Sequence, residues 1–180
     1  MHTLKLVISF AWIAFWIYWL ASAANSKESV SGGWRTRLTG VSAVGVFLIA
    51  GVLRNGSLSV HSVVLGVVGT LLFACGIALA VWARVHLGRN WGMPATQRVE
   101  PELVTSGPYR FVRHPIYTGL LAAMLGTALV DSLVGLIVVA VLVAYFYYCG
   151  IVEERNLTAT FPTAYPEYRS GTKMLIPFLL

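Results

Sequence analysis

The sequence predicts an all-α integral membrane protein of about five transmembrane helices, the last two of which form a C-terminal hairpin. Hydrophobic residues make up 57% of the 180 residues and charged residues only 11%, and the mean hydropathy is +0.75. A soluble domain has about 45–50% apolar and about 25% charged residues. The apolar residues also gather in runs close to the ~20 residues that a span needs. The length fits one domain.

Five apolar runs account for the predicted helices: residues 4–24, 38–53, 62–84, 117–130 and 133–152. The first run has no small-residue cleavage site followed by a soluble domain, so we expect an anchor and not a signal peptide. The fourth is short for a span, and we expect it to extend back to Pro115 or to tilt. Only Asp131 and Ser132 join it to the fifth. The last two helices are therefore predicted to be antiparallel neighbours.

Lysine and arginine concentrate on one side of these spans. If the chain crosses the membrane five times, one side of the membrane holds residues 26–37, residues 85–114 and the C-terminal tail. Together with Arg84 that side carries eleven of the thirteen basic residues, and only Lys5 and Arg54 lie opposite. Because basic loops stay in the cytoplasm, the N-terminus is predicted outside and the C-terminus in the cytoplasm. The net charge of +6 therefore indicates membrane topology rather than nucleic-acid binding.

Two further patterns concern packing and metal chemistry. Cys75 and Cys149 both fall within predicted spans, so the sequence predicts neither a disulfide framework nor a zinc site. Small residues recur within the spans, as in Gly66-x-x-Gly69. Such spacing indicates close helix packing more often than ligand contact.

The longest irregular stretch, residues 88–115, contains apolar and aromatic side chains and is predicted to fold as a cap. It ends in Gly-Pro-Tyr-Arg-Phe-Val-Arg-His-Pro, residues 107–115. Proline disfavours helix in the residue before it and is harmless at the first turn of the next. We therefore expect a short helix over residues 109–114 and a new helix from Pro115. The start of that helix would favour an anionic group.

Ionisable residues gather where this stretch meets the membrane. Arg110, Arg113 and His114 lie close to Tyr117, and Glu153-Glu154 ends the last apolar run. Such groups cost free energy at a membrane boundary unless they are paired or hydrated, so a cluster there indicates a site.

Each of these residues also has a simpler explanation. The arginines would anchor a helix end at lipid headgroups, His114 would be an interfacial histidine, and the tyrosines would belong to an aromatic belt. The two glutamates would be solvated and paired with Arg155. The ordered combination favours a site that encloses a charged small molecule.

The motifs in the second half of the chain are Leu87-Gly-x-Asn-Trp91, Glu102-Leu-Val-Thr-Ser-Gly-Pro-Tyr109, Arg113-His-Pro-x-Tyr117, Glu153-Glu154, Phe161, Tyr165-x-x-Tyr168 and Leu175-Ile-Pro177. In this order they resemble the isoprenylcysteine carboxyl methyltransferase family and its prokaryotic relatives, integral membrane enzymes that use S-adenosylmethionine. The first half matches only in hydropathy. The apolar runs place the first three transmembrane helices in residues 1–86. The resemblance implies a methyltransferase-like cofactor-binding region in residues 87–180, which holds the last two helices and the C-terminal tail. It also implies a prokaryotic inner membrane and a lipophilic or lipidated acceptor.

The resemblance also implies site residues. The cofactor contacts carried over by position are Pro101, Glu102, Leu103, Val104, Tyr109, His114, Pro115, Ile116, Tyr117 and Glu153. Catalytic roles fall on Arg113, His114 and Glu153. A sulfonium already makes methyl loss easy, so catalysis would need alignment and desolvation of the nucleophile and no metal.

Two positions depart from the family pattern. Members that methylate prenylcysteine carry an arginine four positions before the first glutamate, where it is thought to bind the substrate carboxylate; here that position is Cys149. Pro101 stands where relatives often have histidine. By family the acceptor is first a carboxylate, and then an amine or a thiol.

Two other functions fit parts of the sequence. Membrane sterol reductases, which bind NADPH, have a similar Arg-His-Pro-like motif near their C-termini, but they are much longer. A small transporter or assembly factor could use the arginine cluster to bind anionic lipid. The spans lack charged residues in their middles, which argues against a transport path.

Overall fold

The protein is described here from a computed structural model that covers residues 2–23, 60, 62–91 and 102–176. The helices are α1 (His2–Ala23), α3 (Val63–Leu87), α4 (Pro115–Asp131), α5 (Gly135–Thr160) and α6 (Ala164–Gly171), with two short 3₁₀ helices, η1 (Gly88–Asn90) and η2 (Gly107–Arg110). The described residues contain no β-strand. The predicted all-α class is confirmed; the predicted span over residues 38–53 lies outside the described residues.

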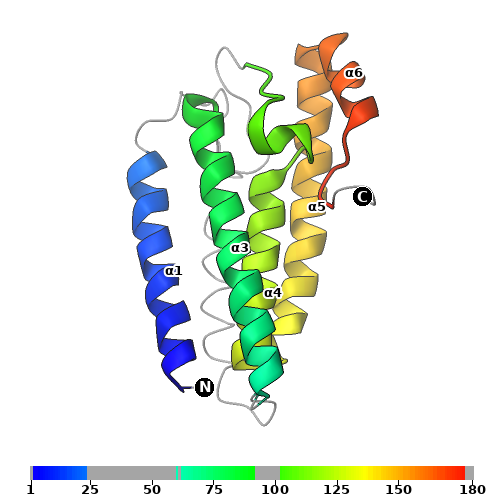
Figure 1. Ribbon diagram of the computed structural model, residues 1–180. Helices are drawn as coiled ribbons and strands as arrows, with labels where there is room; N and C mark the ends of the chain where they lie inside the picture. The colour runs from blue at the N-terminus through cyan, green and yellow to red at the C-terminus, as the bar shows by residue number, and fades with distance from the viewer. Residues whose placement is uncertain (1, 24–59, 61, 92–101, 177–180) are drawn as a thin grey trace, which may run out of the picture.

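Among the described residues, α1, α3 with η1, and α5 are long and apolar enough to cross a membrane. Helix α4 is shorter, with 17 residues, and begins at Pro115 as expected. Figure 1 shows that α3 and α5 end, and α4 begins, at the same end of the bundle, which we call the loop end. The antiparallel α4–α5 hairpin is thus present, joined by residues 132–134.

Glycines allow α3 and α4 to pack closely. A Cβ atom on Gly76 would lie 2.6 Å from the carbonyl oxygen of Gly119, and one on Gly119 would lie 2.6 Å from the carbonyl oxygen of Gly76. Gly69 and Gly126 meet in the same way two turns further along. Small residues let helix backbones approach in a membrane, where van der Waals packing drives association. The site at the loop end therefore rests on a tightly packed helix pair.

Contacts at both ends join α1 to this pair. At the end opposite the loop end, Nζ of Lys5 lies 3.1 Å from Oδ1 of Asp131. At the loop end, Arg84 donates to the carbonyl oxygens of Ser22, at 2.5 Å, and Gly88, at 2.7 Å. Arg84 is buried. Its positive charge interacts favourably with the carbonyl groups at the C-terminal ends of α1 and α3.

The chain beyond α5 folds back over the loop end, which sequence analysis did not predict. Helix α6 follows α5 and leads into residues that pair with Val112, through an isolated parallel bridge to Lys173. The expected helix over residues 109–114 is replaced by η2, because the main chain of Arg113 and His114 donates to Lys173 and Met174 instead. These amides are satisfied by the returning tail and not by a helical turn.

Candidate active site

The loop before α4 is held against α3 by a glycine and a tyrosine. Gly107 has a φ of +59°, and a Cβ atom there would lie 2.5 Å from Nε2 of His86. Glycine adopts this left-handed conformation without steric cost. Tyr109 is buried, and its hydroxyl donates to the carbonyl oxygen of Ala83 at 3.4 Å. Burial raises the pKa of Tyr109, so the hydroxyl stays a neutral donor.

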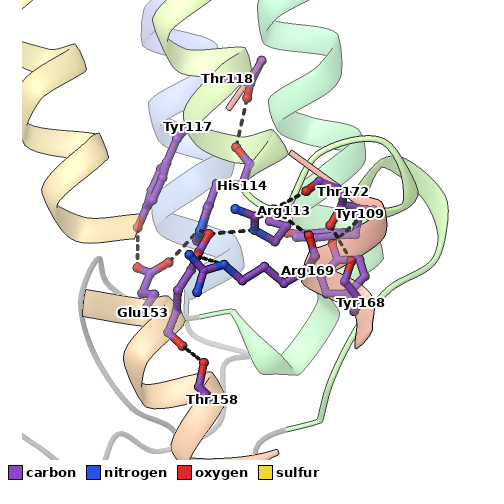
Figure 2. A network of polar contacts seen from close by, with 11 residues as sticks. Tyr109, Arg113, His114, Tyr117, Thr118, Glu153, Thr158, Tyr168, Arg169 and Thr172 are labelled. Carbon is purple, nitrogen blue, oxygen red and sulfur yellow. Dashed lines mark hydrogen bonds and ion pairs between the residues drawn. The ribbon is translucent and has the colours of Figure 1, made fainter. Parts of the chain in front are cut away.

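His114, Tyr117 and Glu153 form the centre of the cluster (Figure 2). Nδ1 of His114 lies 3.3 Å from Oε2 of Glu153, and the hydroxyl of Tyr117 donates to the other oxygen, Oε1. The side chain of Glu153 is 23% exposed, whereas that of His114 is 7% exposed. The carboxylate thus lies at the edge of the cluster, where a ligand can reach it, and the imidazole lies inside.

Aromatic packing fixes the two rings. His114 and Tyr117 are stacked, and Tyr117 stacks in turn on Phe146 of α5, with 4.5 Å between centroids. On α5, Gly150 leaves room for the imidazole, since a Cβ atom there would lie 3.3 Å from Nε2 of His114. The imidazole therefore has little freedom to turn.

The protonation of His114 is set by two opposing effects. Burial disfavours the charged imidazole, but contacts with Glu153 and Glu154 outweigh it, and the pKa of His114 is raised above its ordinary 6.5. Its Nε2 atom lies 3.5 Å from Oε1 of Glu154, yet it makes no hydrogen bond within the described residues. The partner of Nε2 is thus a carboxylate at ion-pair distance, while the closer carboxylate contact of the ring is made by Nδ1.

A second carboxylate, Glu154, joins parts of the chain that are distant in sequence. Its Oε1 atom lies 2.7 Å from Nε of Arg113, and its Oε2 atom lies 3.4 Å from Nε of Arg169 on α6. The Glu154 side chain is only 5% exposed. The sequence left open a pairing of the two glutamates with Arg155. In the structure, the guanidinium partners of Glu154 are those of Arg113 and Arg169.

The structure brings five predicted site residues together: Tyr109, Arg113, His114, Tyr117 and Glu153. Pro115 and Ile116 are buried in the first turn of α4. Arg110 is exposed and stands over the ring of Phe111, so it does not join this cluster.

The remaining predicted residues lie around that centre. Val104 packs against the hydrophobic core and Leu103 is partly buried, while Oε2 of Glu102 accepts from Asn90 at 3.4 Å. Cys149 is buried, with 1% exposure, one turn before Glu153. Pro101 lies outside the described residues.

Sequence reasoning missed the contributions of the tail. Arg113 donates to the carbonyl oxygens of Arg169 and Thr172, and the hydroxyl of Tyr168 donates to the main-chain carbonyl oxygen of Tyr109 at 2.5 Å. Burial raises the pKa of Tyr168 to about 12, so it also remains a donor. The Tyr165-x-x-Tyr168 spacing was the one signal for this contact. Within the described residues, no group of three His, Cys, Asp or Glu side chains is placed to hold a metal ion.

Comparison with known families gives a match over the region that carries these residues. Residues 64–164 match the family described as phospholipid methyltransferase, which is more than half of the chain. The match begins in α3, whereas the motifs recognised in the sequence begin at Leu87. It includes α4 and α5 in full.

Two curated relatives share part of this sequence. One, from Cupriavidus metallidurans, is named cobalt-zinc-cadmium resistance protein CzcN; it is 36% identical over 107 residues, covering 58% of this chain and 47% of the relative. The other, from Bradyrhizobium diazoefficiens, is named methanethiol S-methyltransferase 1; it is 34% identical over 79 residues, covering 43% of this chain and 27% of the relative. The chain spans less than half the length of either relative.

Proposed function

Because the chain belongs to the phospholipid methyltransferase family, we propose that it is a membrane methyltransferase that moves a methyl group from S-adenosylmethionine to a lipophilic acceptor. The observation that carries this proposal is the His114–Glu153–Tyr117 cluster at the loop end, in which the imidazole is buried and the Glu153 carboxylate is partly exposed. The family resemblance carries its cofactor contacts to these same residues, and the fold brings them together.

The chemistry of the cluster fits the proposed methyl donor. Glu153 offers a partly exposed carboxylate for the positive charge of the ligand, and each carboxylate oxygen accepts more than one hydrogen bond. Nε2 of His114 makes no hydrogen bond within the described residues and is suited to a polar group of the ligand. Leu103, Val104 and Tyr109 supply apolar and aromatic surface for the adenosine.

In this proposal the chain contributes binding and alignment. S-adenosylmethionine, when bound, supplies a methyl group already activated by a sulfonium. Glu153 balances ligand charge, His114 orients it, and the packed rings of Tyr117 and Phe146 exclude water from one side of the cluster. Alignment and exclusion of water together lower the barrier of a methyl transfer.

The acceptor class rests on position 149. A carboxylate acceptor is favoured by family, but Cys149 brings no positive charge to it, and a buried anion without a partner is disfavoured. The relative named methanethiol S-methyltransferase supports testing a thiol beside carboxylate and amine acceptors. We propose that the acceptor is lipophilic and reaches the loop end from the bilayer.

We also propose that the loop end faces the cytoplasm of a prokaryotic inner membrane. Arg84 lies in the last turn of α3, Arg113 directly precedes α4 and Arg169 is on α6, all at this end, while Lys5 lies at the other, beside Asp131. Basic residues stay on the cytoplasmic side of a span.

Calorimetric titration of the purified full-length protein in detergent with S-adenosylhomocysteine, and separately with NADPH, tests the function. We expect binding of S-adenosylhomocysteine and none of NADPH. His114→Ala and Glu153→Ala should each weaken binding by about 1–3 kcal/mol, the cost of losing a charged or buried polar partner. Glu167→Ala, at an exposed position on α6, is the control. Binding of NADPH alone would favour the reductase alternative, and wild-type affinity in both site variants would reject this site.

A further inference from the structure

The last turn of α6 and the residues that follow it lie along the start of α4 as a strap, which we define as residues 168–175. The amide of Arg113 donates to the carbonyl oxygen of Lys173 at 2.8 Å, and that of His114 donates to Met174 at 3.1 Å. The hydroxyl of Thr118 donates to the carbonyl oxygen of Leu175 at 2.6 Å. The strap therefore adds hydrogen bonds to the segment that carries the candidate catalytic residues.

The strap also bounds the space around the imidazole. The side chains of Met174 and Leu175 are buried. A Cβ atom on Gly150 would lie 3.4 Å from Sδ of Met174 and 3.3 Å from Nε2 of His114. Met174 and His114 thus pack against the same glycine of α5, so displacement of the strap would open one side of the imidazole.

Glu154 is the carboxylate that links the strap to the cluster. Its Oε1 atom contacts Arg113 at 2.7 Å, and Arg113 in turn donates to the carbonyl oxygens of Arg169 and Thr172. Its Oε2 atom contacts Arg169 at 3.4 Å, and Oε1 also lies 3.5 Å from Nε2 of His114. One side chain therefore contacts α6, the start of α4 and the imidazole.

The two adjacent glutamates differ in accessibility. The Glu153 side chain is 23% exposed, and that of Glu154 is 5% exposed with two guanidinium partners. A bound ligand can reach the first, whereas the second is enclosed by the chain. Removing one partner of a buried ion pair strongly destabilises the folded protein, because the other charge is then left buried without a partner.

We propose that Glu154 is a positioning residue that seats the strap against Arg113 and thereby orients the His114 ring for ligand binding. This inference rests on the proposed function, in which His114 contacts the methyl donor. Glu154 itself acts through Arg113, Arg169 and His114 and not by touching the ligand.

The test compares Glu154→Gln with Glu167→Gln in the full-length protein. Both changes replace a carboxylate by an amide of the same shape, but Glu167 is exposed on α6. One measurement is the rate of tryptic cleavage after Arg169 and Lys173. The other is the pH titration of the His114 ring nitrogens, followed by NMR. Among the described residues, the charged or titratable side chains that contact this ring are Glu153, Glu154 and Tyr117.

We expect Glu154→Gln to raise the cleavage rate severalfold, to move the His114 titration to lower pH, and to weaken S-adenosylhomocysteine binding. Glu167→Gln should leave all three unchanged. Wild-type cleavage in Glu154→Gln would overturn the proposal. Faster cleavage with an unchanged His114 titration would also overturn it, because Glu154 would then be only a tether.

A second variant keeps the test decisive if Glu154→Gln does not fold. Arg169→Gln removes the outer partner, whose side chain is 58% exposed, and we expect faster cleavage after Lys173. A wild-type rate there would reject the strap contact. If the wild-type protein binds no S-adenosylhomocysteine, the proposed function fails, while the cleavage and titration results still decide whether Glu154 seats the strap.

Discussion

The rings of His114 and Tyr117 are stacked, with 5.4 Å between centroids and 9° between planes, and both side chains contact the carboxylate of Glu153. His114 directly precedes α4 and Tyr117 lies in its first turn, so the start of α4 presents two partners to one carboxylate of α5. This relationship makes each contact separately testable.

Tyr117→Phe removes one donor to Glu153 and keeps the stacked ring. We expect the affinity for S-adenosylhomocysteine to fall by about 1–3 kcal/mol, the worth of a hydrogen bond to a charged group. Calorimetric titration measures it. Tyr148→Phe, at a position 64% exposed on α5, should change nothing. If the two variants bind alike, the Tyr117 hydroxyl has no part in organising the site.

The raised pKa of His114 predicts a pH-dependent stability. The folded state binds the proton more tightly than the unfolded state, so this contribution is complete below about pH 6.5 and is lost as pH rises through the folded-state pKa. Glu153→Gln removes the carboxylate at Nδ1. We therefore expect the gap in Tm between wild type and Glu153→Gln to be larger near pH 6 than near pH 9. A gap independent of pH would contradict the pairing.

Gly76→Ala should destabilise the α3–α4 pair. The added Cβ atom would lie 2.5 Å from the amide nitrogen of Ala123 and 2.6 Å from the carbonyl oxygen of Gly119, and backbone atoms cannot move aside cheaply. Overpacking of this kind costs about 1–3 kcal/mol. Thermal unfolding in detergent measures the loss. Gly171→Ala, where a Cβ atom meets nothing within 4 Å, is the matched control and should keep the wild-type Tm.

The distribution of basic residues predicts the topology. Reporter fusions after residues 30, 58, 95 and 180 should report inside, outside, inside and inside, because basic segments remain in the cytoplasm. An outside signal at the C-terminus would overturn both the number of spans and the cytoplasmic placement of the loop end.

Cys149→Arg should add activity toward a prenylcysteine. A cation at this buried position would pair with the acceptor carboxylate, whose burial without a partner is unfavourable. The assay is methyl transfer to N-acetyl-farnesylcysteine, with lipophilic amines, thiols and fatty acids for comparison and Cys149→Ser as the uncharged control. Efficient methylation of the prenylcysteine by wild type would mean that another cation binds that carboxylate.

Local features of the sequence determined the membrane class and the start of α4. Apolar runs predict helices because the bilayer requires every backbone group to bond within its own segment. Pro115 marks a helix start because its ring suits the first turn and excludes continuation from His114. The order of the motifs also predicted the family and most of the clustered residues. The division of the chain at residue 87 stays a prediction.

Only the tertiary structure decided which partners these residues take. Glu153 and Glu154 are adjacent in the sequence, yet one faces His114 and Tyr117 and the other faces Arg113 and Arg169. Successive residues of a helix point about 100° apart, so which glutamate is enclosed depends on what packs against each face. The strap itself forms because the amides of residues 113 and 114 donate to carbonyl oxygens about 60 positions away, and no local pattern encodes a pairing over that distance.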